Sequence, residues 1–376
     1  MTDTPIPQAD PRAGFLALRS RIDIAMIHVI EGGHYVLGRE VLGFEQEFSA
    51  FVGAGHGIGV ANGTDALLLA LKAIEVGPQD YVATVSHTAV ATVAAIELAG
   101  AKPLLIDIDP ATMTLDPQAL AVAVARPPGR IAAVIPVHLY GQPADLGALG
   151  PLAARAGAAL IEDAAQAHGA LWGTRMVGSV GRLGTFSFYP TKNLPALGDG
   201  GMVVTGEETL AERVRALRQY GWRQRYVSEL TGINSRLDEL QAAILRVRLT
   251  MLEAENQRRR DIAAAYDSGL AGLPVALPAR RPNCTHVFHQ YVLRSRKREA
   301  LQRALTTRGI GTNIHYPVPV HLQPAYKGRL AIGPSGLAET ERAAEEVLSL
   351  PMFPQLTEDQ IGRVIAGVHG ACAETD

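Results

Sequence analysis

The sequence predicts an α/β fold, and two observations support this prediction. Short apolar segments alternate with longer helical patterns between about residues 58 and 205, which is typical of a parallel sheet with helices on both faces. The segments are apolar throughout, as in IAAVIPV (131–137), and this indicates buried strands. The predicted strands are 80–85, 103–107, 131–137, 158–162, 184–188 and 201–205. The helices predicted around them are 64–75, 89–99, 116–125, 145–156 and 207–220.

The last third of the chain has a different pattern. A long helical pattern runs from Leu237 to about Leu270, with Arg and Glu at its outer positions, and we expect this helix to link the large domain to a smaller one. A strand is predicted around 287–293, and helices are predicted near 297–308, 337–347 and 357–369. The sequence therefore predicts a large α/β domain over residues 1–250 and a smaller α+β domain over residues 251–376.

Charge and cysteine content exclude several classes of protein. The 376 residues include 35 basic and 37 acidic side chains, so neither nucleic acid nor a membrane surface is an expected partner. Two cysteines, Cys284 and Cys372, are too few for a disulfide framework or a cysteine-built zinc site, and no metal site is expected. The first residues show no signal-peptide pattern, and the apolar runs 88–100 and 118–125 are interrupted or short. We therefore expect a cytoplasmic protein.

Two polar side chains at strand ends predict the chemistry. Asp163 follows the predicted strand 158–162, and Lys192 follows the predicted strand 184–188. Taken separately, Asp163 fits a helix cap and Lys192 fits a solvated surface charge. Together they supply what pyridoxal phosphate requires of a protein, an acid beside the pyridinium nitrogen and an amine that forms a Schiff base. The aromatic segment before Lys192 is expected to bury its amine and to lower its pKa.

Further polar groups predict the remainder of a cofactor site. Gln166 lies about one helical turn after Asp163 and is placed to bond a ring substituent. Gly63 and Thr64 begin a predicted helix, where free N–H groups and the helix dipole suit a phosphate. An ordinary Thr N-cap is the alternative interpretation of this segment. Ser187 is a second candidate for the phosphate.

A series of short motifs runs along nearly the whole chain. The motifs are GHYVLG (33–38), ANGTDAL (61–67), PVHLYG (136–141), EDAAQAHGA (162–170), FSFYPTKN (186–193), GINSRLD (232–238), GIGTNIHYP (309–317) and LSLP (348–351). In this order they resemble the DegT/DnrJ/EryC1/StrS family, the sugar aminotransferases of aspartate-aminotransferase fold type I. The resemblance implies pyridoxal 5'-phosphate as the cofactor. It also implies a large domain with a mostly parallel seven-stranded sheet between helices, followed by a smaller C-terminal α+β domain.

The resemblance implies a role for each matching cofactor residue. Lys192 would be the Schiff-base lysine and the proton shuttle, and Asp163 would be the partner of the ring nitrogen. Gln166 would bond the hydroxyl side of the ring. The residues implied to hold the phosphate are Gly63, Thr64 and Ser187.

The resemblance also implies a shared site and a substrate pocket. Asn234 would reach the phosphate of the neighbouring subunit's cofactor, so the expected working unit is a homodimer with active sites shared across the interface. The residues implied to line the sugar-nucleotide pocket are Tyr35, Tyr189, His315 and Tyr316. One position departs from the family pattern, because Ala89 stands where an aromatic residue usually stacks on the cofactor ring. His87 is then a candidate to cover the ring.

The implied reaction is a two-step transamination. L-glutamate would give its amino group to the cofactor, which would then aminate a keto group of a nucleotide-linked deoxysugar. Some relatives have histidine in place of the lysine and act as dehydratases, so Lys192 favours transamination. Two alternatives stay open: a regulator that binds pyridoxal phosphate without catalysis, and a dehydratase or lyase on the same scaffold. The sequence does not predict which sugar, which nucleotide or which ring carbon takes part.

Overall fold

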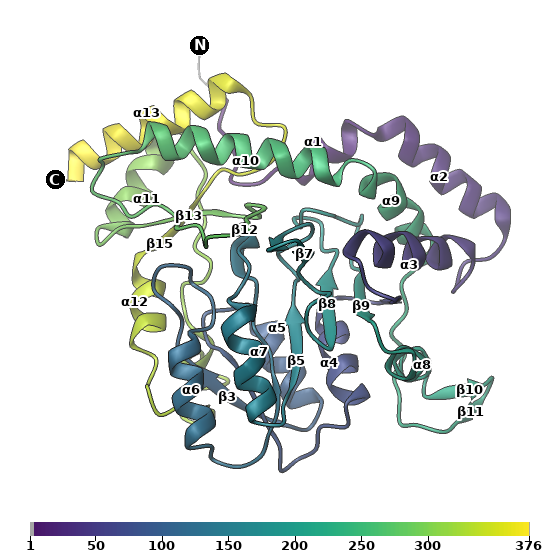
Figure 1. Cartoon of the computed structure of the whole chain (residues 1–376). Helices are drawn as coiled ribbons and strands as arrows, with labels where there is room; N and C mark the ends of the chain where they lie inside the picture. Colours follow the sequence, from purple (N-terminus) through teal and green to yellow (C-terminus); the bar gives the residue numbers. More distant parts are fainter. Residues whose placement is uncertain (1–3, 376) are drawn as a thin grey trace.

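A computed structural model describes residues 4–375; the start of the N-terminal stretch considered above lies outside these residues. Within the described residues, the largest sheet has 8 strands in the order β1-β9-β8-β5-β4-β2-β3-β14 (Figure 1). Strand β9 is antiparallel to β1 and β8, and the remaining neighbours are parallel. The strands are β1 (His56–Val60), β2 (Tyr81–Val85), β3 (Lys102–Ile106), β4 (Ile131–Val134), β5 (Ala159–Asp163), β8 (Leu183–Ser187), β9 (Gly201–Thr205) and β14 (Ala331–Ile332).

The mostly parallel sheet confirms the predicted fold class, but the described residues form 8 strands where seven were expected. The additional strand, β14, comes from the C-terminal third of the chain. It pairs in parallel with β3, with Ala331 opposite Leu104 and Ile332 opposite Leu105. A strand of 2 residues is too short to produce a periodic pattern in the sequence.

Helices cover both faces of the sheet. Successive strand residues point to opposite faces, so strands that are apolar throughout have apolar side chains to bury on both. In β9, Val203 packs in one core with α4, α5 and α8, whereas Met202 and Val204 pack in another core with α3 and α9. Helices α6 and α7 pack in a third core, against β2, β3 and β4. The bounds of these helices are α3 (Arg39–Val52), α4 (Gly63–Ala73), α5 (Val90–Leu98), α6 (Pro117–Ala125), α7 (Leu146–Arg155), α8 (Glu208–Leu217) and α9 (Glu239–Leu249).

The prediction of one long helix from Leu237 to about Leu270 is wrong, because the structure has two helices there, α9 and α10 (Leu252–Gly269). The division falls at Thr250 and Met251. The Thr250 hydroxyl donates a hydrogen bond back to the Val247 carbonyl at 2.8 Å, a contact that competes with the regular helix ladder. As a result, α9 packs on α2 and α3, while α10 packs on α13.

A second core lies beside the large sheet and is built mostly from the end of the chain. Strands β13 (Tyr291–Arg294) and β15 (Val347–Leu350) pair antiparallel, and α10, α11 (Arg298–Thr307) and α13 (Glu358–Thr375) pack around them. The strand predicted at 287–293 thus begins later than expected. Ile6, near the other end of the chain, is buried in this same core. The predicted boundary near residue 250 stays a prediction.

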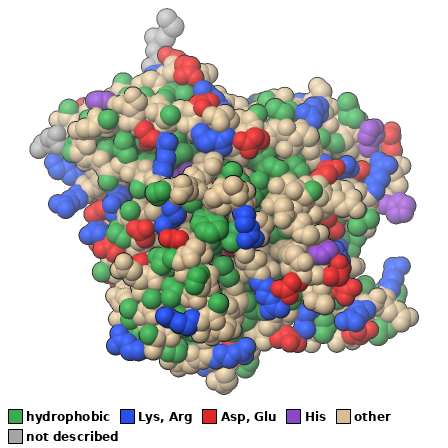
Figure 2. Space-filling view, in the orientation of Figure 1, with side chains coloured by type: hydrophobic (Ala, Val, Ile, Leu, Met, Phe, Trp, Pro, Cys, Tyr) green, Lys and Arg blue, Asp and Glu red, His purple; other side chains and the backbone are tan. Residues whose placement is uncertain are grey.

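Shorter elements complete the described chain. They are α1 (Pro11–Leu16), α2 (Arg19–Gly32), η1 (Leu139–Gly141), β6 (Leu171–Trp172), β7 (Arg175–Met176), β10 (Trp222–Gln224), β11 (Val227–Ser228), β12 (Cys284–Thr285), η2 (Val320–Leu322) and α12 (Ala338–Glu346). The β10–β11 hairpin projects from the body at the lower right of Figure 1. Figure 2 shows basic and acidic side chains intermixed over this face of the molecule. No helix among the described residues combines the length and the apolar character that crossing a membrane requires.

Candidate active site

A cavity of ≈ 560 Å³ lies where several strands of the large sheet end. Parallel α/β sheets bind ligands at this edge, at the carboxyl ends of their strands. Asp163 ends β5 and Ser187 ends β8, and both line the cavity. The predicted site residues that line it are Gly63, Thr64, Ala89, Asp163, Gln166, Ser187, Tyr189 and Lys192. The fold therefore gathers residues from three of the sequence motifs, and Ala89 in addition, around one space.

Lys192 enters the cavity from a tight turn after β8. Its backbone N–H donates to the carbonyl of Tyr189 at 2.8 Å. Burial lowers the pKa of the Lys192 amine to about 8, although the nearby Asp163 carboxylate acts in the opposite direction. About a tenth of such amines are uncharged at pH 7. This environment favours a nucleophilic lysine over a solvated surface charge.

Asp163 is buried and held by two hydrogen bonds. The Thr92 hydroxyl donates to Oδ2 at 2.9 Å, and the Ala165 N–H donates to Oδ1 at 3.2 Å. Burial raises the pKa of Asp163, and these hydrogen bonds, followed by the charges of Lys192 and His138, limit the rise. Among the described residues a turn, not a helix, follows Asp163, so the interpretation as a helix cap is wrong. Its carboxylate is left to face a ligand.

Gln166 connects the cavity to a second wall of polar groups. Its Oε1 accepts a hydrogen bond from the Tyr140 N–H at 2.8 Å, and its Nε2 donates to the Tyr316 hydroxyl at 3.1 Å. Burial raises the pKa of Tyr316 to about 12. The Tyr140 hydroxyl in turn donates to the carbonyl of His315. The motif around His315 thus lies directly behind Gln166.

The start of α4 forms the other end of the cavity. Asn62, not Thr64, is the N-cap, because its side chain accepts from the Asp65 N–H at 2.8 Å. The alternative interpretation of Thr64 as the cap is therefore wrong. A Cβ on Gly63 would lie 2.7 Å from the Cβ of Ser187, so glycine is needed for this close approach. The helix terminus and the Ser187 hydroxyl together suit an anion such as a phosphate.

The opposite sides of the cavity thus fit the two ends of pyridoxal phosphate. An acid and an amine lie at the strand ends, and a helix N-terminus with a serine hydroxyl lies beside them. Thr92 was not expected from the sequence, although it lies one helical turn after Ala89 and therefore on the same side of α5. Its hydroxyl contacts both Asp163 and, at 3.1 Å, the hydroxyl of Thr88.

Of the two residues expected near the cofactor ring, Ala89 and His87, only Ala89 lies at the cavity. Ala89 lines the cavity, whereas His87 is buried outside its lining. His87 Nε2 lies 2.8 Å from the Tyr140 hydroxyl, and its Nδ1 has no hydrogen-bond partner among the described residues. Burial lowers the pKa of His87 to about 4, so the ring is neutral. His87 supports Tyr140 in this structure and does not cover the cavity.

The structure does not bring the other predicted residues into this cavity within the single chain. Asn234 is exposed, and Tyr35 is 57% exposed with its hydroxyl donating to the carbonyl of Ile30 at 3.1 Å. His315 lies near Lys192, and its Nδ1 is 2.8 Å from the Ser349 hydroxyl. Burial first, and then the charge of Lys192, lower the pKa of His315 to about 4.

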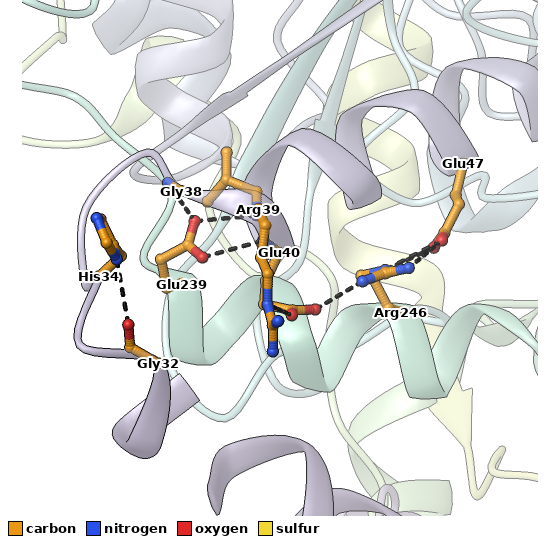
Figure 3. Close-up of polar contacts among 9 residues, drawn as sticks. Gly32, His34, Gly38, Arg39, Glu40, Glu47, Glu239 and Arg246 are labelled. Carbon is orange, nitrogen blue, oxygen red and sulfur yellow. Dashed lines mark hydrogen bonds and ion pairs between the residues drawn. The ribbon is translucent and has the colours of Figure 1, made fainter. Parts of the chain in front are cut away.

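The loop that carries Tyr35 is held by α9 (Figure 3). Both carboxylate oxygens of Glu239 accept hydrogen bonds from the start of α3: Oε1 from the N–H groups of Gly38 at 2.7 Å and Val41 at 3.0 Å, and Oε2 from that of Glu40 at 3.0 Å. A carboxylate at a helix N-terminus is stabilising. The 33–38 loop is therefore fixed at one end while Tyr35 itself stays on the surface.

Comparison with known proteins places the chain in a family. The DegT/DnrJ/EryC1/StrS aminotransferase family matches residues 17–369. A dTDP-3-amino-3,4,6-trideoxy-alpha-D-glucose transaminase of Streptomyces venezuelae is 48% identical over 369 residues, which are 97% of this chain and 96% of that protein. The erythromycin biosynthesis sensory transduction protein EryC1 of Saccharopolyspora erythraea is 47% identical over 362 residues, 96% of this chain and 98% of that protein.

The likeness extends to the fold. The crystal structure of S. venezuelae DesV in complex with a ketimine intermediate has a TM-score of 0.95 and 46% identity, and the match covers 99% of this chain and 100% of that chain. Sequence and structure agree over the whole length, and the cavity described above has the residues that the cofactor requires. The chain therefore belongs to the DegT/DnrJ/EryC1/StrS aminotransferase family and is a pyridoxal-phosphate-dependent aminotransferase, as the resemblance of its motifs implied.

Proposed function

We propose that this enzyme moves an amino group from L-glutamate to a keto group of a nucleotide-linked deoxysugar. The observation that carries this proposal is the placement of Lys192 and Asp163 on one cavity beside an anion-binding helix terminus. Pyridoxal phosphate, when bound, supplies an electron sink for the carbanion that forms when a proton leaves the amino-bearing carbon. The names of the relatives support the acceptor class, since they act on dTDP- or UDP-linked sugars.

The proposed role of Lys192 follows from its pKa of about 8. An amine with this pKa is partly uncharged near neutral pH, so it can attack a carbonyl carbon. The same amine can take a proton from one carbon and return it to another, because its pKa is close to the working pH. The turn at Tyr189 holds the backbone of Lys192 in place while its side chain moves.

The other cavity residues are proposed to bind and orient. Asp163, fixed by Thr92 and Ala165, would pair with the protonated ring nitrogen. Gln166, already oriented by Tyr140, would face the ring hydroxyl. The phosphate would bind at the start of α4, to Gly63, Thr64 and Ser187. Ala89 leaves space above the ring, which we propose is filled by substrate.

We further propose that two copies of the chain share each site. Among the described residues lining the cavity, Lys192 is the only basic side chain, whereas a diphosphate and a dicarboxylate require several donors. Asn234 and Arg236, near the exposed β10–β11 hairpin, would then serve the neighbouring subunit. Large apolar side chains exposed on and near α2 support an interface there. They are Leu16, Ile24, Ile27, Ile30, Tyr35, Val36 and Leu42.

The proposed sugar-nucleotide pocket is formed by residues at the rim. Tyr189 is 52% exposed and lines the cavity, while His315 and Tyr316 lie behind Gln166. Tyr35 would approach from the N-terminal loop of the same or the second subunit. We also propose a cytoplasmic location, since two cysteines in 376 residues are too few for the disulfide framework that is common in secreted proteins.

The test is the visible absorption spectrum of the purified protein with pyridoxal phosphate, before and after L-glutamate. Loss of the yellow band on adding glutamate, and its return on adding a dTDP- or UDP-linked 3-keto sugar, is the expected result. A band that glutamate leaves unchanged would overturn the proposed donor. The name of the EryC1 relative keeps a regulator as the second candidate, and that function predicts a band that no amino acid and no keto sugar changes.

A further inference from the structure

The residue after Lys192 is buried and has several partners that are distant from it in the sequence. Asn193 is 3% exposed. Its Nδ2 donates to Asn256 Oδ1 in α10 at 2.9 Å and to the Val287 carbonyl at 3.1 Å. Its Oδ1 lies 3.2 Å from Nδ1 of His289. One side chain next to the catalytic lysine therefore contacts α10 and the loop before β13.

The direction of these hydrogen bonds is fixed by their chemistry. Two acceptors face Asn193 Nδ2, so its amide orientation is settled, and its Oδ1 must accept from His289. His289 Nδ1 consequently carries the proton, and its Nε2 is left to accept from Gln290 Nε2 at 3.5 Å. Burial, followed by the charges of Lys192 and Arg259, holds the pKa of His289 well below its usual value. The ring is therefore a neutral donor with one available tautomer.

The same network continues to the other catalytic motif. Asn256 is 0% exposed, and its Nδ2 donates to the carbonyl of His168 at 2.8 Å. A Cβ on Gly169 would lie 2.6 Å from this nitrogen, so the chain after Asp163 and Gln166 packs tightly against Asn256. The segments that carry Lys192 and Asp163 are thus joined through a side chain of α10.

We propose that Asn193, held by His289 and Asn256, is a positioning residue that sets the location of Lys192 relative to Asp163. The inference rests on the proposed role of Lys192 in amino transfer. Asn193 does not itself line the cavity, so it acts through its neighbour in the chain. Through Asn193 the second core contacts the segment that carries Lys192, since α10 and Phe288 of the 287–290 loop belong to that core.

A purely structural role for the network is separable from a positioning role. A contact that only joins two packed units affects the stability of the fold and leaves the environment of Lys192 unchanged. A positioning contact also keeps water from the amine and keeps the amine aligned. Loss of positioning therefore changes the pKa of Lys192 and the maximal rate, in addition to any change in stability.

The experiment compares variants of the full chain. Asn193→Leu keeps the volume and removes every hydrogen bond, and His289→Leu removes one donor. His289→Asn is the conservative variant, because its amide N–H can replace Nδ1–H. The control is Gln142→Leu, since Gln142 is also buried and also joins the two units, through the Ala279 carbonyl at 2.7 Å, yet it lies outside the network.

Two quantities are measured for each variant. The first is the pKa of Lys192 in cofactor-free protein, from the pH dependence of acetic anhydride labelling followed by mass spectrometry. The second is the rate of the glutamate half-reaction with cofactor bound, resolved into kcat and KM. For the two Leu variants we expect the pKa to rise from about 8 by about one unit toward its usual value. We expect kcat to fall about 10- to 100-fold with KM within about threefold, and His289→Asn to recover most of both.

Each outcome decides the inference. Unchanged pKa and kcat in a folded Asn193→Leu, or equal changes in Gln142→Leu, would overturn it. If Asn193→Leu does not fold, the comparison of His289→Leu with His289→Asn gives the same test. If the natural chain itself does not react with glutamate, the proposed donor is contradicted. A pKa of Lys192 that is shifted in Asn193→Leu but not in Gln142→Leu would still support the positioning role in that case.

Discussion

The two ends of the active site differ in how they are built. At the cofactor end the polar groups are buried and bonded: Asp163 is 4% exposed, and its carboxylate accepts from the Thr92 hydroxyl and the Ala165 N–H. Its neighbour in β5, Glu162, lies outside the cavity and is 0% exposed, and its two oxygens accept from His138 Nε2 at 2.9 Å and from the backbone N–H groups of Gly178, Val180 and Gly181 at 2.6–2.8 Å. At the proposed substrate end, Tyr189 at the cavity and Tyr35 outside it are both more than half exposed. The difference teaches that a single chain places Lys192 and Asp163 on one cavity, whereas under the proposed function recognition of the sugar would depend on surface residues.

The largest effect expected is that of removing the amine at the cofactor end. Lys192→Ala is predicted to lower the rate of the glutamate half-reaction by more than about 10³-fold, because both the nucleophile and the proton carrier are lost. Stopped-flow absorbance measures this rate. Lys102→Ala is the control, since Lys102 is exposed and contacts Gln79 on the surface. A Lys192→Ala protein that reacts at the normal rate would remove the distinction between the two ends.

Glu162→Gln is predicted to reduce the free energy of unfolding by about 3 kcal/mol, because an amide N–H would face backbone donors in a buried position. Although burial alone would raise the pKa of Glu162, the bonds from His138, Gly178 and Gly181 lower it below its usual 4.5. Its ionised form therefore stabilises the fold above pH 4.5, and this contribution is lost as the pH falls through the lowered pKa. Urea unfolding at pH 7 and pH 4 measures the change; a difference that does not shrink at pH 4 would contradict the argument.

Lys192→Met is predicted to increase the free energy of unfolding, whereas Glu162→Gln decreases it. The pKa of Lys192 falls from 10.5 to about 8 in the folded chain, so the unfolded chain binds more protons and stability increases with pH between these values. At pH 7 the cofactor-free Met variant is expected to be more stable than the natural chain by about 3 kcal/mol. At pH 11 the two should agree. Equal stability at pH 7 would mean that Lys192 is not held in a costly environment.

The smallest effect is expected at the substrate end. Tyr35→Ala is predicted to leave the glutamate half-reaction unchanged and to raise KM for the sugar acceptor about 5-fold, because one exposed contact contributes about 1 kcal/mol. Steady-state kinetics with varied acceptor measures KM. If Tyr35→Ala slows the glutamate half-reaction, the two ends are coupled more closely than the exposure of Tyr35 indicates.

The predictable parts of the site were those carried by local sequence. Asp163 and Lys192 could be predicted because Asp163 lies at the end of an apolar strand and Lys192 lies in the turn after another, and the start of α4 could be predicted because glycine and polar residues precede an apolar helix. The strand β14 could not, since it depends on pairing with the distant strand β3. The break at Thr250 could not either, since the helical pattern of apolar residues does not show whether a threonine hydroxyl bonds back to a carbonyl. The same holds for His87. Its position two residues before Ala89 made it a candidate to cover the cofactor ring, but its side chain contacts Tyr140. The partners of Asn193 were equally out of reach, because Asn256 and His289 are 63 and 96 positions away.

The pairing of β14 with β3 has a consequence for how the chain is made. Strand β3, with the sequence KPLLI, is mostly apolar, and one side of it is paired with Ala331 and Ile332, followed by a hydrogen bond from the Gly333 N–H to the Leu105 carbonyl at 2.8 Å. This segment leaves the ribosome long after β3, so the growing chain carries an open apolar edge for most of its synthesis. Open edges of this kind recruit strands from other molecules. A truncation before residue 331 should therefore aggregate, although it keeps every residue that lines the catalytic cavity.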